Sequence, residues 1–276
     1  MAEVSAKDVA ALRKVTGAGM MDCKAALQAN EGDMERAKDW LREKGIAGAA
    51  KRAGREADQG SIEVLVEGSA GAIVELNCET DFVAKGDVFK QAVASLAKIV
   101  VEHGDADLGS RTIGSETVDD FVKGLSGTLG EKIEVGRVVR FDAAAGLIDG
   151  YKHVQNERGV VGVLVELAGV DANDAKAREV AHDIALHIAS AAPRFVSRDD
   201  VPADEVERER DVLQKQTAEE GKPEQAWPKI VEGKLTAFFK DRVLTEQDLF
   251  NEKGNPVSGA LDGGSVVRFA LASVGG

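Results

Sequence analysis

Apolar residues recur every three or four positions along residues 1–45, which is the period of an amphipathic helix. They are Val9, Leu12, Val15, Met20, Cys23, Ala26, Leu27, Met34, Ala37, Trp40 and Leu41. Two glycine-containing breaks interrupt the period, and the second ends in Asp33, a favourable N-cap. A cation and a glycine are typical of helix C-termini, so we expect the third helix to end at Lys44-Gly45. The pattern predicts a three-helix bundle over residues 1–45.

The rest of the chain carries an internal repeat. Gly-Ala-Ile-Val-Glu-Leu at residues 71–76 matches Gly-Val-Leu-Val-Glu-Leu at residues 162–167, and the same offset of 91 relates apolar positions of the helices expected next. Each copy closes with Val-Val-Arg-Phe, at residues 138–141 and 266–269, and a further candidate strand precedes each copy. We therefore expect an α+β fold with two repeated subdomains, each an antiparallel sheet with helices.

Residues 202–244 differ from both copies. A charged helix begins at Pro202, a turn follows at Gly221-Lys222-Pro223, and a second helix carries apolar positions. Such a helical hairpin of the coiled-coil type would be about 27 Å long at 1.5 Å rise per residue. The charge of most of the hairpin is typical of a solvated strut, and an arm that contacts a partner is the alternative.

These patterns divide the chain into four parts. They are the bundle at 1–45, an Ala-, Gly- and charge-rich linker at 46–58, a first core subdomain at 59–145, and a second at 146–276, which holds the hairpin 202–244.

Composition narrows the function classes. The net charge of −13 over 276 residues argues against nucleic acid as a direct partner, although residues 1–55 carry +3. No apolar run is long enough for a membrane span, and no basic segment with an apolar stretch opens the sequence. We expect a cytoplasmic protein that does not bind membranes. The cysteines and histidines have no zinc-site spacing, so we expect no metal, and Cys23 and Cys78 should be small buried residues.

No catalytic or cofactor motif is found in the sequence. The Walker phosphate-binding pattern is absent, and Gly17-Ala-Gly resembles a dinucleotide loop only in its first residues, because the third glycine is missing. No serine lies in a nucleophile-elbow setting. We expect no catalytic residue and no bound cofactor.

The segment after the first repeated strand is the most informative one. Phe82 is an aromatic residue in a polar strand-to-helix segment, and Thr80 and Asp81 suit a helix N-terminus. One interpretation folds Phe82 back into the core and makes Asp81 the cap. The repeat favours another, because the scaffold recurs at the offset of 91 but the chemistry of this loop does not. A protruding Phe beside an Asp suits a wedge that enters a partner.

Two stretches resemble signatures of the bacterial translation elongation factor Ts family. The first runs Leu12-Arg13-Lys-Val-Thr16-Gly17-Ala18-Gly19-Met20-Met21-Asp22-Cys23-Lys24, and the second is Glu79-Thr80-Asp81-Phe82-Val83-Ala84. Further stretches agree, among them Tyr151-Lys152-His153 and Gly221-Lys222-Pro223, so the resemblance covers nearly the whole chain. Residues 255–264 depart from the family pattern, being short and glycine-rich where the family has a helix.

The resemblance implies a guanine-nucleotide exchange factor for elongation factor Tu, the GTPase that delivers aminoacyl-tRNA to the ribosome. It implies a ubiquitin-associated-like bundle, two related core subdomains and a coiled-coil insertion. The bundle would contact the nucleotide-binding domain of the GTPase, in its GDP-bound and nucleotide-free states. The bundle positions implied are Leu12, Arg13, Thr16, Gly17, Gly19 and Met20. The wedge positions implied are Thr80, Asp81, Phe82 and Val83, which reach the magnesium site, and His153, which presses near the phosphate-binding loop.

Two other function classes stay open. A passive interaction protein would use the small bundle to recognise a peptide or helix and would have no need of Phe82 as a wedge. An enzyme would need a pocket of convergent polar groups, which the sequence does not indicate. For His153, the alternative is a sheet residue that packs or forms a hydrogen bond locally.

Overall fold

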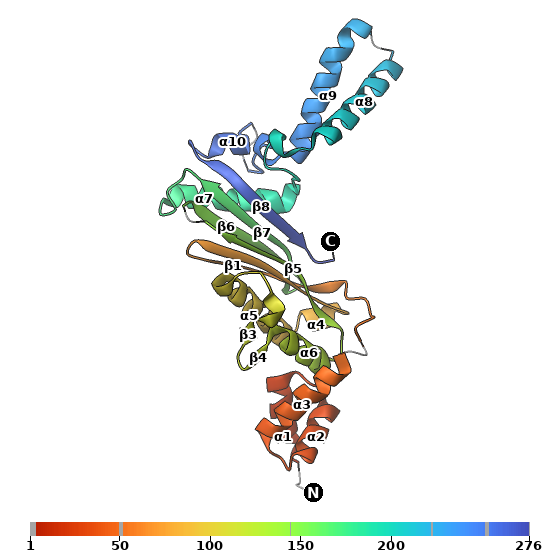
Figure 1. Ribbon diagram of the computed structural model, residues 1–276, viewed down its shortest axis with the longest axis vertical. Coiled ribbons are helices and arrows are strands. Elements are labelled where there is room, and N and C mark those ends of the chain that lie inside the picture. The colour runs from red at the N-terminus through yellow and green to blue at the C-terminus, as the bar shows by residue number, and fades with distance from the viewer. Residues whose placement is uncertain (1–3, 50–51, 144, 222, 252–253, 276) are drawn as a thin grey trace. The chain divides into compact units, whose positions relative to one another are not determined.

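The computed structural model describes residues 4–49, 52–143, 145–221, 223–251 and 254–275 (Figure 1). The chain forms two compact units. The first contains Met1–Phe141, Lys152–Gly162 and Ala272–Gly276, and the second contains Asp142–Tyr151 and Val163–Leu271. Three N-terminal helices precede antiparallel sheets with helices, so the predicted α+β class is confirmed. Within the described residues, no helix is long and apolar enough to cross a membrane.

Three helices form the N-terminal bundle: α1 (Ala6–Thr16), α2 (Met20–Ala29) and α3 (Met34–Ala49). The apolar period buries Leu12, Cys23 and Leu27 among the core residues of the bundle, as predicted. Asp33 accepts hydrogen bonds from two backbone N–H groups of the first turn of α3, which confirms it as the N-cap.

The predicted end of the third helix at Lys44-Gly45 is wrong. α3 continues to Ala49, because the alanines that follow Gly45 favour a helix and Gly45 itself packs against another helix. Part of the predicted linker 46–58 is therefore helical, and its residues 50–51 lie outside the described residues.

The first unit is built on a sheet with the order β1 (Gln59–Glu67), β2 (Ala70–Cys78) and β5 (Ile133–Asp142). β1 and β2 are antiparallel, with Gln59 opposite Cys78. Helix α5 (Asp87–His103) packs along both strands, as Figure 1 shows. Its apolar face, which includes Phe89, joins β2 in the main core of this unit.

The segment between α5 and β5 holds elements that we did not predict. They are η1 (Leu108–Ser110), β3 (Thr112–Ile113), β4 (Glu116–Thr117) and α6 (Val118–Leu129). Thr117 caps α6 by accepting a hydrogen bond from the N–H of Asp120, and Gly130 ends it in the left-handed region. α6 packs against α3, and this contact attaches the bundle to the rest of the first unit.

The second sheet has the order β6 (Leu147–Gln155), β7 (Arg158–Ala168) and β8 (Ser265–Ser273), and α7 (Ala175–Ala191) follows β7. Two glutamates related by the offset of 91 are both buried and both bind their closing strand. Glu75 accepts a 3.0 Å hydrogen bond from the N–H of Arg137, and Glu166 accepts one of 2.6 Å from Nε of Arg268.

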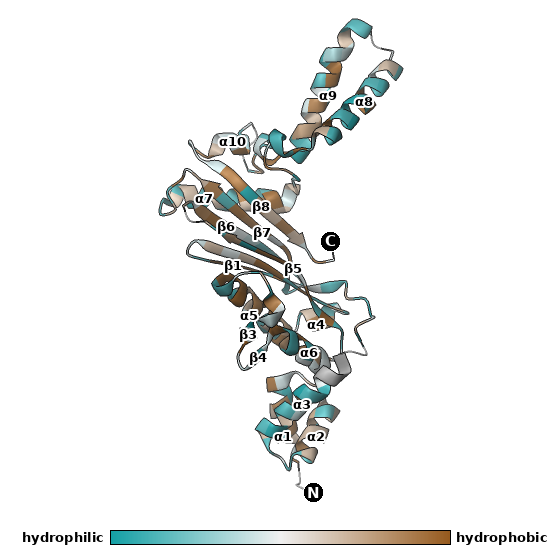
Figure 2. Cartoon of the chain, in the orientation of Figure 1, coloured by the Kyte–Doolittle hydropathy of each residue, from teal (hydrophilic) through white to brown (hydrophobic). Residues whose placement is uncertain are grey.

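Two antiparallel helices form the predicted hairpin in the second unit: α8 (Ala203–Glu219) and α9 (Trp227–Arg242). Leu213 of α8 packs with Leu235 and Phe238 of α9 in a cluster of their own, while Figure 2 shows hydrophilic residues along most of α8. The short elements around it are η2 (Arg198–Asp200), η3 (Glu224–Ala226), η4 (Leu244–Glu246) and α10 (Val257–Ala260). The glycine-rich stretch 255–264 thus holds only the four-residue α10.

Candidate functional site

A one-turn helix, α4 (Asp81–Ala84), follows β2 directly. Thr80 is its N-cap, in extended backbone conformation, and the Thr80 hydroxyl accepts a 3.4 Å hydrogen bond from the N–H of Val83. The prediction of a helix N-terminus is confirmed. The cap is Thr80, however, and the interpretation that gave this role to Asp81 is wrong.

Phe82 lies on the outer side of α4. Its side chain is 83% exposed, whereas Ala84 is buried and Val83 is half-buried against the main core of the first unit. One helical turn places these neighbours on different sides of α4, so anchoring Val83 and Ala84 presents Phe82 to solvent. The alternative in which Phe82 folds back into the core is wrong.

Asp81 stands beside Phe82 as a charged group. Its carboxylate forms a 2.5 Å ion pair with Nζ of Lys85, and the same Nζ lies 5.9 Å from the centre of the Phe82 ring. The hydrogen bond from Lys85 holds the pKa of Asp81 below its usual value, and the positive charge of Arg158 acts in the same direction. Asp81 is therefore ionised at neutral pH and can act on a cation in a partner.

Two glutamates fix the backbone before α4. Glu131, which follows α6, accepts a 2.9 Å hydrogen bond from the N–H of Thr80 and a 2.6 Å hydrogen bond from its hydroxyl. Glu79 accepts a 2.6 Å hydrogen bond from the N–H of Lys132 and a 3.1 Å bond from Nη1 of Arg55. The Lys132 bond is the main cause that lowers the pKa of Glu79. Sequence reasoning missed these anchors, because the partners lie far apart in the chain and have no shared motif.

Cys78, the last residue of β2, contacts the backbone of the loop before α4. Both cysteines are buried and free, as predicted, and the Cys78 thiol donates to the carbonyl oxygen of Thr80 at 3.1 Å. Burial raises the pKa of this thiol to about 12. Because the thiolate is the reactive form, Cys78 is chemically quiet in the folded protein.

A thiol-labelling experiment tests this quiet state of Cys78. In a Cys23→Ala protein, where Cys78 is the remaining thiol, an aromatic disulfide reagent at pH 8 should label the folded chain at least about 100-fold more slowly than the chain in urea. The labelling rate should rise as pH increases toward 12, because the thiolate then forms. Rapid labelling of the folded protein at pH 8 would contradict the burial and hydrogen bonding seen here.

His153 is exposed near the end of β6. The two-residue turn to β7 consists of Asn156 and Glu157, both with positive φ, which is the geometry of a tight hairpin turn. Beside His153, Nζ of Lys152 forms a 2.6 Å ion pair with Glu63 of β1. On the return strand, Arg158 donates to the carbonyl of Gly60 at 2.9 Å, and its charge also lowers the pKa of Asp81. The hairpin that carries His153 therefore lies on β1 in the same unit as α4.

The bundle signature divides into buried and exposed positions. Leu12 is buried in the bundle core, whereas Arg13, Gly19 and Met20 are exposed. Thr16 and Gly17 are half-buried in the turn between α1 and α2. The Thr16 hydroxyl donates to the Leu12 carbonyl at 2.7 Å, and Gly17 has φ +72°, a value that favours glycine.

Three exposed apolar residues lie beside this turn, and two of them, Val15 and Met20, were wrongly predicted on apolar helix faces. Val15 was predicted on the apolar face of the first helix, but its side chain is 61% exposed, and Met21 is 74% exposed. With Met20 at 56%, these residues make an apolar surface on both sides of the turn, which we call the bundle patch. The signal for Met21 was available, since it lies outside the helical apolar period.

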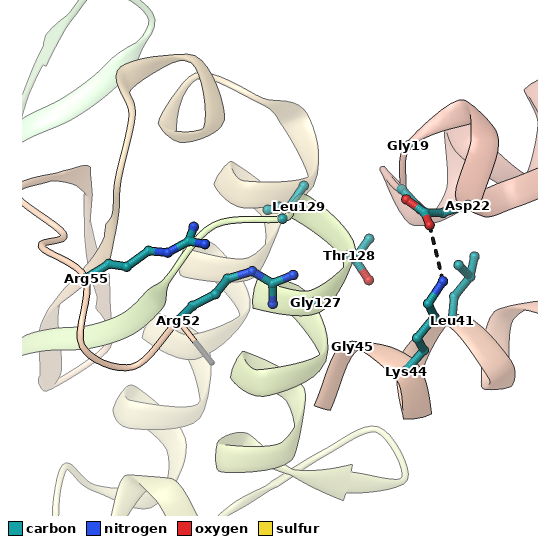
Figure 3. Close-up of a pocket in the computed structure, with 12 residues that line it drawn as sticks. Gly19, Asp22, Leu41, Lys44, Gly45, Arg52, Arg55, Gly127, Thr128 and Leu129 are labelled. Carbon is teal, nitrogen blue, oxygen red and sulfur yellow. Dashed lines mark hydrogen bonds and ion pairs between the residues drawn. The ribbon is translucent and has the colours of Figure 1, made fainter. Parts of the chain in front are cut away.

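A hollow lies between the bundle and α6 (Figure 3). Lys44 and Asp22 form an ion pair across α3 and α2 at its rim, and Arg52 and Arg55 line another side.

Within the described ranges, no three His, Cys, Asp or Glu side chains come together as a metal site.

The comparisons with known proteins agree with one another. The family model described as elongation factor TS matches residues 79–276. The chain is 46% identical over 283 residues to "Elongation factor Ts" of Nocardioides sp. and 44% identical over 287 residues to that of Micrococcus luteus, with the full length of both chains covered in each case. It is 41% identical over 271 residues to "Elongation factor Ts" of Prosthecochloris aestuarii, a match that covers 95% of this chain and 92% of the relative. The chain therefore belongs to the elongation factor Ts family of translation elongation factors.

Proposed function

We propose that this protein promotes release of GDP from elongation factor Tu by entering its magnesium and phosphate sites with the loop around α4. Members of the elongation factor Ts family are exchange factors and not enzymes. The observation that carries the mechanism is Phe82, an 83% exposed aromatic side chain on a firmly anchored turn, beside the ionised Asp81. This function places the protein in the cytoplasm.

The exchange step needs no proton transfer by this chain. A GTPase holds GDP through a magnesium ion and through backbone N–H groups around the phosphates. A factor that binds more tightly when those contacts are open lowers the affinity for GDP, and by linkage GDP lowers the affinity for the factor equally. The factor therefore binds both the GDP-bound and the nucleotide-free GTPase, and it favours the second.

Three side chains would have separate roles in opening the nucleotide site. Phe82 would fill the opened site, and burial of a Phe side chain contributes about 1.5–3 kcal/mol. Asp81 would disturb the ligand shell of the magnesium ion bound to the partner, because that ion would compete with Lys85 for the Asp81 carboxylate. His153, exposed on β6, would displace the phosphate-binding loop.

The bundle would bind first. Its patch, formed by Val15, Met20 and Met21, offers apolar surface, and the exposed Arg13 adds a positive charge beside it. Docking of the bundle on the nucleotide-binding domain then raises the effective concentration of the wedge at the magnesium site.

We also propose the remaining domain divisions that the sequence predicts. They are the two core subdomains at 59–145 and 146–276, and the hairpin 202–244, which would serve as a solvated strut.

Release of a fluorescent GDP analogue from elongation factor Tu tests the function, with unlabelled GDP in excess. Addition of this protein should accelerate release, and the Asp81→Ala/Phe82→Ala double variant should lose most of the acceleration while still binding. Binding without acceleration by the unaltered protein would instead make it a passive interaction protein that docks through its bundle.

A further inference from the structure

The contacts around Thr80 point to a residue that acts through another one. The backbone just before the wedge is held by a side chain that lies 51 residues further along the chain, just after α6. Glu131 receives both the N–H and the hydroxyl of Thr80, at 2.9 and 2.6 Å. A carboxylate that accepts two hydrogen bonds from one residue fixes both its position and its rotamer.

The second bond matters for α4 itself. The Thr80 hydroxyl donates its proton to Glu131 and accepts the N–H of Val83, so its oxygen is oriented as an N-cap. A helix of one turn has little stability of its own, and its conformation depends on such tertiary contacts. Without Glu131, the cap loses the group that orients it.

Glu131 is itself fixed in place. The Ser126 hydroxyl of α6 donates to the carbonyl oxygen of Glu131 at 2.6 Å. Directly after it, the N–H of Lys132 donates to Glu79, which also binds Arg55. The loop before α4 is thus attached to the α6–β5 connection through two adjacent residues, Glu131 and Lys132. This double attachment fixes the direction in which α4 projects Phe82.

We propose that Glu131 is a positioning residue for nucleotide exchange: it holds Thr80, and through Thr80 it presents Asp81 and Phe82 in the orientation that enters the partner. This inference rests on the proposed function. It assigns no contact with the partner to Glu131, so Glu131 should affect how well the wedge enters and should leave docking of the bundle unchanged.

The test compares Glu131→Ala, Glu131→Gln and the control Glu134→Gln. Glu134 is exposed on β5 three residues further on, and it pairs with Lys132 through its side chain at 2.9 Å. In the free protein, amide hydrogen exchange at Thr80 should become at least about tenfold faster in Glu131→Ala, because the N–H loses a charged acceptor. Glu131→Gln keeps one acceptor oxygen and should lie between Glu131→Ala and the unaltered protein.

The same variants are then measured on elongation factor Tu loaded with fluorescent GDP. In Glu131→Ala the release rate at saturating factor should fall about tenfold, and the half-saturating concentration should stay within about twofold. Glu134→Gln should match the unaltered protein in all three measurements. Unchanged Thr80 exchange in Glu131→Ala, or a half-saturating concentration that changes as much as the rate, would overturn the proposal.

These readouts separate the two proposals. If Thr80 exchange rises but the unaltered protein releases no GDP, the proposed function fails while the role of Glu131 in the loop stands. If the unaltered protein is active and Thr80 exchange is unaffected, the positioning role alone is wrong. Should Glu131→Ala fail to fold, Glu131→Gln carries the same comparison with one bond retained.

Discussion

Replacing Phe82 with Ala should slow GDP release at saturating factor about 10- to 100-fold. Phe82 is 83% exposed in the free protein, so the proposed complex is where its side chain would gain apolar burial. Burying a Phe contributes about 1.5–3 kcal/mol. If this burial takes place only when the magnesium and phosphate contacts are open, its loss lowers the maximum rate and spares initial docking. The half-saturating concentration should therefore change by less than about threefold.

The chain offers a matched control for this experiment. Phe250 lies in the second unit and is 55% exposed, so Phe250→Ala removes the same exposed aromatic group without touching the loop around α4. Neither substitution should change the free energy of unfolding by more than about 0.5 kcal/mol, because both side chains are on the surface. Equal losses of release rate and docking in Phe82→Ala would mean that Phe82 is an ordinary contact residue and not a wedge.

The elements that sequence analysis predicted well are those with a strong local signal. Strand β2 is mostly apolar and begins after a turn, and α5 has apolar residues at helical spacing, so the sequence predicted both. The break between α1 and α2 was marked by two glycines, and one of them, Gly17, adopts the left-handed conformation that ends α1. The surroundings of Phe82 left both a core and an exposed position open, and the repeat favoured exposure, which the structure shows.

The features that were missed depend on contacts between distant segments. Nothing in the sequence around residue 131 indicates that its carboxylate binds Thr80, since α4, α5, η1, the β3–β4 hairpin and α6 separate the two. Val15 has helical spacing relative to Leu12, yet it is exposed, because one helical stripe is wider than the core of so small a bundle. Gly45 looked like a helix end, and the neighbour in space against which it packs could not be read from the sequence.

That neighbour is Gly127. The backbones of α3 and α6 cross where these two glycines meet: a Cβ on Gly127 would overlap Cα of Gly45 and lie 2.6 Å from its carbonyl oxygen. A Cβ on Gly45 would lie 3.0 Å from the carbonyl oxygen of Gly124 and 3.0 Å from Cα of Gly127. Backbone atoms cannot rotate away as a flexible side chain does. Any side chain at this crossing must therefore push the two helices apart.

Gly127→Ala should lower the free energy of unfolding of the bundle, in its packed position against α6, by about 2–3 kcal/mol, because overpacking at a tight contact costs about this much. The sign of this change identifies the close crossing, because Gly→Ala in a helix without such a contact raises stability by about 0.5–1 kcal/mol. Gly233→Ala on α9 is the control: a Cβ there meets nothing within 4 Å, and the change should be neutral or stabilising. Urea unfolding followed by Trp40 fluorescence, in a Trp227→Phe background that leaves one tryptophan, reports the bundle.

The functional consequence of Gly127→Ala should be the reverse of that of Phe82→Ala. In the proposed function, a bundle that no longer packs on α6 would still bind the GTPase, but its docking would no longer bring α4 to the magnesium site, so the effective concentration of the wedge would fall. The half-saturating concentration for GDP release should rise about tenfold or more, while the rate at saturation should change little. If Gly127→Ala instead stabilises the protein as Gly233→Ala does, the close crossing of α3 and α6 is absent in solution. Docking and wedging would then be independent functions of two separate parts of the first unit.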